Sequence, residues 1–500
     1  MTDIIVHKKN EVFIQLECNE GIAKELYEDF TFQAKNYQYG KRKGWDGRIH
    51  LFHLRDYSIY AGLTRQICRW AREKQYTISG EKKPSIPLVG KALETFYDGL
   101  RLPFQPREDQ TDIFQKCVIE ECGTIISPTG SGKSLIAYLL TQWYNVKTLI
   151  IVPTINLVEQ MSGDFADYGF NVGSYCHKVY EGADPISDKQ VTITTWQALI
   201  DLPNEYFNHF QMVIGDEAQG FKAKSLRAIM ERMVHTPYRF AMTATLANEN
   251  ELVNELIIEG LFGPQIIGST TQDLIKEGHL AELEINIIVL KYPEAFCRTM
   301  RRKSINEETD FLVSYEPRQS YIRNLACSLK GSTFVLYRLV EKHGKGLFDI
   351  IHKVKGDNTH IVYGETDAEN RELIRLTANE NVNTTVVASY GVFSGGVNVP
   401  NLRNGVFASS YKSKIKVLQS IGRTLRKTPT KPKATIYDIV DDLSIGTHIN
   451  YSVKHYLERL KLYYKEFPDM NIKIYTVPLE VPKQEGKTPK NAKNKKLCKQ

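Results

Sequence analysis

The stretch that decides the fold of this chain reads Ser127-Pro128-Thr129-Gly130-Ser131-Gly132-Lys133-Ser134. It follows an apolar run at residues 124–126 and precedes a segment of helical composition at residues 135–143. The order of strand, glycine-rich turn and helix is the context that a phosphate-binding loop requires, because backbone N–H groups and a helix N-terminus then point at one anion. We therefore predict a nucleotide-binding α/β domain around this loop.

The residue types in the loop each have a physical reason to be there. Gly130 and Gly132 permit positive φ and a close approach of the backbone to phosphate. Lys133 can reach the β- and γ-phosphates, and the Ser134 hydroxyl can bind Mg²⁺. The strict pattern has glycine where this chain has Ser127, which we interpret as a variant of the loop rather than an ordinary turn with a solvated lysine. The candidate nucleotide-binding residues in the loop are Thr129, Gly130, Ser131, Gly132, Lys133 and Ser134.

The composition is that of a protein with several hydrophobic cores. The chain has 500 residues, of which 42% are hydrophobic and 25% charged, and this length predicts about three domains. No apolar run approaches the roughly 18 residues of a membrane span, and the N-terminus lacks the pattern of a secretory signal. Eight cysteines are scattered without the paired spacing of a zinc site. We expect a reduced, cytoplasmic compartment and no membrane partner.

Positive charge is concentrated near the two ends of the chain. Seven lysines and one glutamate lie between Lys483 and Lys499. Near the N-terminus, a glycine-rich stretch at residues 37–48 mixes cations with aromatic residues, which suits contacts to nucleic-acid phosphates with some base stacking. A solvated hairpin whose aromatic residues pack inward explains that stretch about equally well. The candidate nucleic-acid-binding residues are Lys41, Arg42, Lys43, Trp45 and Arg48.

The pattern of apolar runs divides the chain into segments. Alternation at Val12, Ile14 and Leu16, followed by a helical pattern, predicts a small α+β domain. Further along, short apolar runs alternate with helical segments, which is typical of a parallel sheet covered by helices, and this series breaks off once and then resumes. We predict an α+β domain at 1–90, α/β domains at 91–265 and 266–443, a helical extension at 444–481 and a basic, disordered tail at 482–500.

An acidic pair follows an apolar strand, about 80 residues after the phosphate loop. Asp216 at the strand end can bind Mg²⁺, and Glu217 can polarise the water that attacks a γ-phosphate. The alternative is an acidic pair that only caps the next helix. We favour the catalytic interpretation because the phosphate loop and the acidic pair lie in one predicted sheet. Thr243 and Thr245 end the next strand, where their hydroxyls could bond toward the acidic pair.

Three further features are open to two interpretations. Gln110 lies just before the first helix of the α/β region, where its amide could read an adenine edge, and we choose it over Gln105. Arg423 and Arg426 lie three residues apart on a predicted helix, so they form either an arginine finger or a solvated basic face. A glycine-rich loop at residues 388–400 could contact ribose or nucleic-acid phosphates through its backbone amides.

As a set, these motifs resemble those of superfamily-two helicases. Segments 128–134, 153–160, 192–199, 216–219, 243–245, 391–400 and 419–426 occur in that family's order, and 274–280 looks like the entry to its second motor domain. The whole chain is similar to the recombination and repair helicases of T-even bacteriophages. The resemblance implies an α/β fold with two RecA-like parallel-sheet motor domains in tandem, preceded by a small α+β domain and followed by a helical segment and a Lys-rich tail.

The resemblance also implies an activity, which is ATP-dependent helicase action on branched DNA: crossover junctions, stalled forks and R-loops. It implies ATP and Mg²⁺ as cofactors. As partners it implies DNA, RNA–DNA hybrids and single-strand-binding or recombination proteins, for a monomer in the host cytoplasm. The implied roles are catalysis by Lys133, Asp216, Glu217, Arg423 and Arg426, metal binding by Ser134 and Asp216, and coupling by Gln219, Thr243, Thr245, Gly396, Asn398 and Gln419. Gln219 and Asn398 depart from the residues that relatives most often carry.

Three other functions could use parts of the same sequence. One is a double-strand translocase that hydrolyses ATP without separating strands, and another is a strand-annealing nucleic-acid-binding protein whose basic ends do the work. The third is a nuclease, against which we find no metal-binding carboxylate set apart from Asp216 and Glu217. A Lys133→Ala variant separates the helicase from the annealing protein, because only the helicase needs the phosphate loop.

Overall fold

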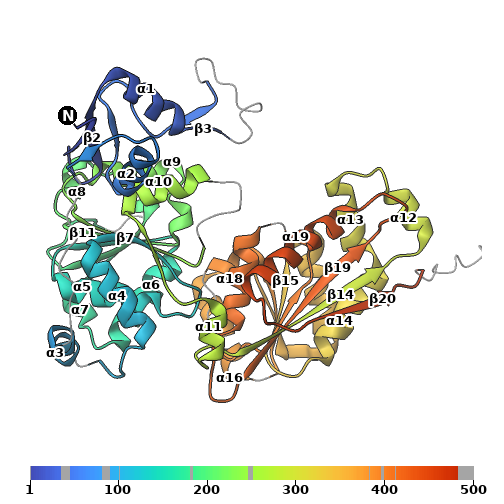
Figure 1. The fold of residues 1–500 in the computed structure, drawn as a ribbon. Helices are drawn as coiled ribbons and strands as arrows, with labels where there is room; N and C mark the ends of the chain where they lie inside the picture. Colours follow the sequence, from blue (N-terminus) through green and yellow to red (C-terminus); the bar gives the residue numbers. More distant parts are fainter. Residues whose placement is uncertain are drawn as a thin grey trace, which may run out of the picture.

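The computed structural model describes residues 2–34, 46–80, 91–100, 102–180, 184–245, 252–381, 383–395, 399–411 and 413–481. Figure 1 shows a small N-terminal domain above one large sheet and a second large sheet beside the first. Each large sheet has seven strands, and every strand pairing within them is parallel. The predicted fold class, two parallel-sheet domains in tandem behind a small α+β domain, is confirmed.

The N-terminal domain has a four-stranded sheet in the order β5-β2-β1-β6. Its alternating residues Ile14 and Leu16 on β2 are buried, as the sequence pattern predicts. The first helix is capped by the preceding residue Asn19, whose side chain accepts a hydrogen bond from the Ile22 N–H at 2.9 Å. The elements are β1 (Ile4–Lys8), β2 (Phe13–Cys18), α1 (Glu20–Asp29), β3 (Thr31–Gln33), β4 (Arg48–His50), β5 (Ser58–Tyr60), α2 (Thr64–Glu73) and β6 (Ile78–Ser79).

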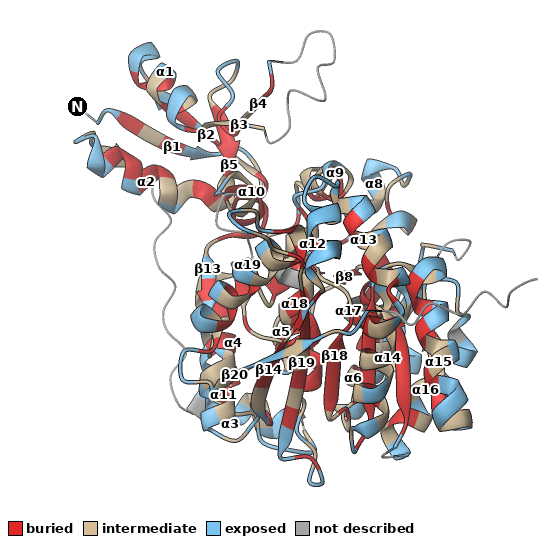
Figure 2. Cartoon of the chain, turned by 90° about the vertical axis from the view of Figure 1, so that its right-hand side faces the viewer, coloured by how far each residue is buried: buried red, intermediate tan, exposed pale blue. Residues whose placement is uncertain are grey.

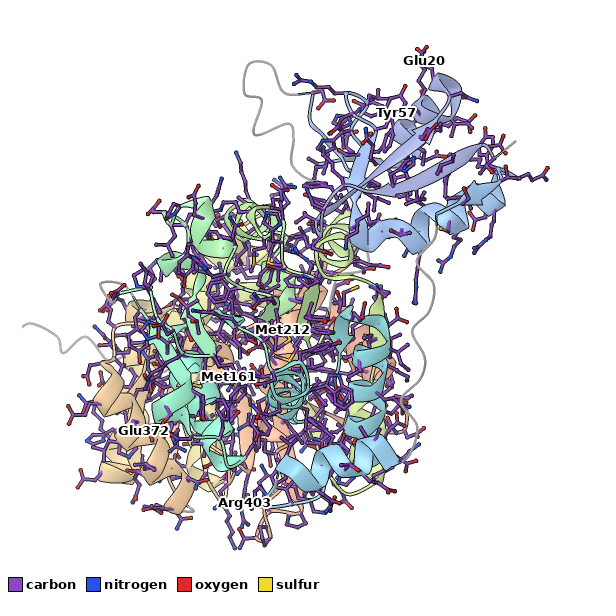
Figure 3. The ribbon with its side chains drawn as sticks, turned by 90° about the vertical axis from the view of Figure 1, so that its left-hand side faces the viewer. Glu20, Tyr57, Met161, Met212, Glu372 and Arg403 are labelled. Atoms are coloured by element: carbon purple, nitrogen blue, oxygen red, sulfur yellow. The ribbon has the colours of Figure 1, made fainter. Side chains whose placement is uncertain are left out.

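This domain packs directly on the first large sheet's helices. The Tyr60 hydroxyl donates to Glu231 at 2.5 Å, and the Gln66 amide donates to Glu259 at 3.0 Å. Gly260 lies so close to Tyr60 that a Cβ there would lie 2.7 Å from the tyrosine Cβ. Buried residues of both parts belong to one hydrophobic cluster. Figure 3 shows the two parts in contact, with Glu20 and Tyr57 in the upper one and Met161 and Met212 in the lower one.

The first large sheet has the strand order β13-β7-β12-β11-β8-β10-β9, which puts the ends of β7, β12 and β11 side by side. The phosphate loop follows β7, and the acidic pair follows β11. The elements are α3 (Lys91–Leu100), α4 (Glu108–Glu120), β7 (Cys122–Ile126), α5 (Lys133–Tyr144), β8 (Thr148–Val152), α6 (Ile155–Asp167), α7 (Val172–Tyr175), β9 (Cys176–Val179), β10 (Val191–Thr195), α8 (Asn204–Phe207), β11 (Met212–Asp216), α9 (Lys224–Arg232), β12 (Tyr238–Thr243), α10 (Leu252–Phe262) and β13 (Gln265–Ile267).

The second large sheet has the order β16-β17-β15-β18-β19-β14-β20. Figure 2 shows buried residues along central strands such as β18 and exposed residues on outer helices such as α15 and α16. The elements are α11 (Thr271–Lys276), β14 (Glu282–Lys291), α12 (Glu294–Met300), α13 (Ile305–Ser314), α14 (Glu316–Ser328), β15 (Thr333–Tyr337), α15 (Lys345–Lys355), β16 (Thr359–Val362), α16 (Ala368–Glu380), β17 (Thr385–Ser389), α17 (Tyr390–Gly395), β18 (Asn404–Phe407), α18 (Lys414–Thr424), β19 (Lys433–Asp442), α19 (Tyr451–Glu466) and β20 (Ile472–Pro478).

Residues 444–481 contain the predicted helix, α19, and also a strand that the sequence analysis did not predict. β20 pairs in parallel with β14 and forms an edge of the second sheet. The helix is fixed to the same sheet, because the buried Arg459 guanidinium donates twice to Asp438 at 2.8 Å and the Tyr463 hydroxyl donates to the same carboxylate at 2.9 Å. This segment is therefore part of the second domain's sheet and core.

Several predicted functional residues lie outside the described residues. They are Lys41, Arg42, Lys43 and Trp45 of the N-terminal basic stretch, Gly396 and Asn398 of the glycine-rich loop, and the tail at 482–500. Arg48 is described and lies exposed on β4. Within the described residues, no helix is both long enough and apolar enough to cross a membrane.

Candidate active site

A cavity of about 440 Å³ lies between the two large sheets. Its walls come from the phosphate loop, the acidic pair, helix α6 and the second domain. The residues that line it are Thr129, Gly130, Gly132, Lys133, Ser134, Leu157, Gln160, Met161, Asp164, Tyr168, Asp216, Glu217, Met242, His279, Leu280, Pro400, Gln419, Arg423, Arg426 and Lys427. All five predicted catalytic residues therefore lie around one space, although they are spread over almost 300 residues of sequence.

The phosphate loop has the backbone that its glycines predict. Gly130 and Gly132 have φ of 86° and 87°, values that side chains with a Cβ rarely adopt. The Lys133 ammonium donates to the carbonyls of Ser127 and Pro128 at 2.9 and 3.0 Å, so the lysine lies across its own loop. Burial lowers its pKa, while the carboxylates of the acidic pair act in the opposite direction.

Gln110 lies beneath the loop and holds it. Its amide oxygen accepts from the Arg107 N–H at 3.0 Å, and its amide nitrogen donates to the Ser131 carbonyl at 2.9 Å. A Cβ at Gly132 would lie 2.2 Å from that nitrogen, so the amide fits closely against the loop. Neither Gln110 nor Ser131 lines the cavity. The geometry thus supports a loop-supporting role for Gln110, and its reading of an adenine edge stays a prediction.

Helix α6 and the residue that directly follows it supply two site residues that the sequence analysis missed. The Tyr168 hydroxyl lies 2.9 Å from the Ser134 hydroxyl, the candidate metal ligand. Burial raises the pKa of the Asp164 carboxyl, and a hydrogen bond from Ser134 and the charge of Arg426 oppose that rise. A signal exists in the sequence, because Leu157, Met161, Asp164 and Tyr168 recur at the three- and four-residue spacing of one helix face.

The acidic pair is held in an unusual conformation. Glu217 has a φ of 52°, in the left-handed region that costs a residue with a Cβ about 1 kcal/mol or more. Burial and the adjacent Glu217 raise the pKa of Asp216 to about 7, although Lys133 opposes the rise. The left-handed turn places Glu217 immediately beyond the strand end, with both carboxylates lining the cavity.

Four of the predicted coupling residues join the acidic pair in one hydrogen-bonded chain. The Thr243 hydroxyl donates to Gln219 at 2.6 Å, and the Gln219 amide donates to Glu217 at 2.7 Å. The Thr245 N–H donates to the Thr243 hydroxyl at 3.1 Å. From the second domain, the Gln419 amide donates to the same Glu217 oxygen at 3.0 Å. The series of hydrogen bonds therefore connects the two domains at Glu217.

Replacing Gln419 tests this connection. Gln419→Ala removes the hydrogen bond that the Gln419 amide donates to the Glu217 carboxylate, an interaction worth about 1.5–3 kcal/mol. We therefore expect kcat for ATP hydrolysis to fall by about 10- to 100-fold, with KM changed less than about threefold. Ser420→Ala is the matched control, because Ser420 donates only to the Lys416 carbonyl within the same helix. Steady-state ATPase assays measure both, and equal kcat values for the two variants would contradict the coupling role.

The two predicted finger arginines face different groups. Helix α18 ends at Thr424, so Arg423 is on the helix but Arg426 follows it, where its backbone bridges to Leu280. Burial and the charge of Arg426 lower the pKa of Arg423 to about 10, and Glu217 and Asp216 oppose this. Burial also lowers the pKa of Arg426, where the opposing charge is Asp164. Arg423 therefore faces the acidic pair and Arg426 faces α6.

The helix that carries Arg423 fits tightly against the phosphate loop. A Cβ at Gly422 would lie 2.7 Å from the Thr129 Cβ, so α18 approaches the loop closely at a glycine. Leu280 of the second domain approaches Gly130 in the same way, 3.0 Å from a Cβ built there. Within the described residues, no group of three or more His, Cys, Asp or Glu side chains is placed to hold a metal ion.

Family models match the N-terminal domain and the first large-sheet domain. Residues 3–81 match the family described as "DNA helicase UvsW, N-terminal", and residues 103–248 match "Type III restriction enzyme, res subunit". The ATP-dependent DNA helicase uvsW of Enterobacteria phage T4 is 32% identical, covering 93% of this chain and 98% of that protein. The DNA 3'-5' translocase XPB2 of Sulfurisphaera tokodaii is 24% identical, covering 75% of this chain and 88% of that protein.

A comparison with solved structures agrees with the sequence comparisons. The crystal structure of T4 UvsW is similar with a TM-score of 0.50 at 30% identity, covering 96% of this chain and 100% of that one. The similarity therefore extends over the N-terminal domain and both large sheets, and is not confined to the nucleotide-binding loop.

Proposed function

This chain belongs to the UvsW family of ATP-dependent, superfamily-two DNA helicases, and from that premise we propose that it hydrolyses ATP to remodel branched DNA. The substrates that we propose are crossover junctions, stalled forks and R-loops in recombination, repair and replication control. We also propose that the chain acts as a monomer alongside single-strand-binding or recombination proteins.

The observation that carries the proposal is the cavity with walls from both domains. Lys133, Asp216 and Glu217 come from the first domain, and Gln419 and Arg423 come from the second. A site divided in this way is complete only when the domains are closed, so hydrolysis and domain motion depend on each other. A motor that moves on nucleic acid needs that dependence.

The proposed chemistry assigns one role to each group. Glu217 orients and polarises the attacking water, Lys133 binds the β- and γ-phosphates, and Arg423 stabilises the charge that develops on the transferred phosphoryl group. Ser134 and Asp216 are hard oxygen donors in one cavity, a set that fits Mg²⁺. When bound there, Mg²⁺ supplies charge neutralisation at the phosphates. The Ser134 oxygen keeps a free lone pair for a metal ion while its hydroxyl is hydrogen-bonded to Tyr168.

ATP hydrolysis with different nucleic acids tests the proposed function. We expect turnover to be low without nucleic acid and to rise most with a synthetic four-way junction, compared with single strands and plain duplex. Unwinding and branch migration are then measured on the junction, with Lys133→Ala as the inactive control. Hydrolysis stimulated by duplex without any strand separation would favour the translocase, and annealing that survives Lys133→Ala would favour the strand-annealing protein.

We propose that the N-terminal domain contacts the duplex arms of a branch. It packs on the first motor domain through Tyr60 and Gln66, which supports a fixed position of the folded N-terminal domain relative to the motor. A contact made through phosphates is independent of sequence and releases counterions. The salt dependence of binding is therefore the property to measure.

Changing Lys41, Arg42, Lys43 and Arg48 together to alanine should weaken junction binding and leave ATP hydrolysis without DNA unchanged. The slope of log affinity against log salt should flatten by up to about three units, because each lost duplex phosphate contact removes about 0.9. Fluorescence anisotropy at several salt concentrations measures this. An unchanged slope with a lower melting temperature would show that the stretch only supports the fold.

A further inference from the structure

Lys431 is a buried lysine that the proposed chemistry does not use. None of its surface is exposed. Its ammonium donates at 2.8 Å to the Thr424 carbonyl and at 2.8 Å to the Pro400 carbonyl. Thr424 is the last residue of α18, and Pro400 lines the nucleotide cavity at the end of the glycine-rich loop. One side chain therefore connects two walls of the site from behind.

The Thr424 carbonyl, which Lys431 binds, lies at the end of helix α18. The last carbonyls of a helix have no hydrogen-bond partner within the helix and form the negative end of its dipole. The Lys431 ammonium at the Thr424 carbonyl therefore supplies both a hydrogen-bond donor and a favourable positive charge. Thr424 lies between Arg423 and Arg426 in the chain. On the other side, the Arg426 backbone bridges to Leu280, and the Ala281 N–H donates to the Leu425 carbonyl at 2.8 Å. The segment that carries both arginines is thus fixed on two sides.

The charge of Lys431 has cationic neighbours. Burial and the charges of Arg426, just beyond α18, and Arg403, just before β18, lower its pKa to about 7. A buried cation with such neighbours costs stability, and an apolar side chain would avoid that cost. A role in stability alone therefore accounts poorly for a lysine at this position.

We propose that Lys431 is a positioning residue for ATP hydrolysis: it fixes the end of α18 to the glycine-rich loop, so that Arg423 and Arg426 are held at the nucleotide cavity when the domains close. This inference rests on the hydrolytic role proposed above for Arg423, whose helix end Lys431 holds. Lys431 does not line the cavity, so it acts on the arginines and not on the nucleotide.

The experiment compares full-length Lys431→Met, Lys431→Arg and the wild type by DNA-stimulated ATPase across pH 6–9. We expect Lys431→Met to lower kcat at least about tenfold while KM for ATP and junction affinity stay within about threefold, because bonds from a charged donor are the strong ones. Lys433→Met is the matched control, since this neighbouring lysine is exposed and pairs with Glu284 on the adjacent strand β14.

The pH profile separates positioning from stability. The ratio of wild-type kcat to Lys431→Arg kcat should fall as pH rises through about 7, because Lys431 loses its charge there and arginine keeps it, while the titration of Asp216 near the same pH is common to both proteins and cancels in the ratio. The free energy of unfolding of the wild type should move the opposite way and rise above pH 7, because the unfolded chain then binds more protons. The two readouts have opposite signs, so a purely structural effect cannot imitate the expected result.

Each outcome decides the matter. If Lys431→Met keeps the wild-type kcat, or if Lys431→Arg keeps the same alkaline decline as the wild type, the inference is wrong. If Lys431→Met does not fold, which circular dichroism shows, the Lys431→Arg profile alone decides in the same way. A wild type without DNA-stimulated hydrolysis would instead overturn the proposed function, before any variant is compared.

Discussion

Glu217→Gln is expected to bind ATP with nearly wild-type affinity and to lower its turnover by about 10³-fold, within the range that loss of a general base produces. The substitution is nearly isosteric, and the new amide oxygen can still accept from Gln219 and Gln419, which donate to Glu217 at 2.7 and 3.0 Å. The hydrogen-bonded chain between the domains is therefore kept. What is lost is the negative charge that polarises the attacking water.

Single-turnover hydrolysis and equilibrium binding of a fluorescent ATP analogue separate these effects. Lys133→Ala provides the contrast, because it removes a phosphate counter-charge and should weaken nucleotide binding itself. Glu205→Gln on α8 is the matched control, an exposed glutamate of the same domain. Turnover by Glu217→Gln within about threefold of the wild type would mean that another group activates the water.

The parts of the site that the sequence predicted well are local. In the phosphate loop, the glycines, the lysine and the serine are adjacent in sequence, and the positive φ of Gly130 and Gly132 follows from residue type alone. The acidic pair is also local, because a strand end and two carboxylates are contiguous. Apolar runs predicted most strands of both large sheets, since buried parallel strands are hydrophobic on both faces.

What the sequence did not predict depends on contacts between distant segments. Asp164 and Tyr168 became site residues because α6 packs beside α5, and the spacing of their segment indicates only that these side chains share a helix face, not what that face binds. β20 was missed because exposed edge residues such as Ile474 and Tyr475 give no clear alternation. Lys431 is similar, because a lysine in a turn is normally solvated, and only the return of the chain beneath α18 buries it.

The pair Arg423 and Arg426 shows the same limit in one motif. Spacing placed both on one helix face, but α18 ends between them, because the Arg426 backbone pairs with Leu280 of a segment almost 150 residues earlier. The structure thereby distinguishes two residues that the sequence treated as equivalent. The structure also predicts which of the two arginines, when replaced, lowers kcat more.

Arg423→Ala is expected to lower kcat by about 10³-fold or more while ATP affinity stays nearly unchanged. Arg423 faces Glu217 and Asp216, where charge develops on the γ-phosphoryl group, and it lies one turn after Gln419, which bonds Glu217. Arg426 faces Asp164 instead, so Arg426→Ala should cost less in kcat. The ranking of the two variants is therefore part of the prediction.

Stopped-flow hydrolysis and junction binding, measured on both arginine variants, test that ranking. Arg423→Lys adds a useful comparison, because lysine keeps the charge but not the planar fork that can contact two phosphate oxygens, so it should restore only part of the rate. If both alanine variants instead lose junction affinity and keep kcat, then α18 faces the DNA and the finger assignment fails. If Arg426→Ala lowers kcat more than Arg423→Ala does, Arg426 is the finger and the ranking is wrong.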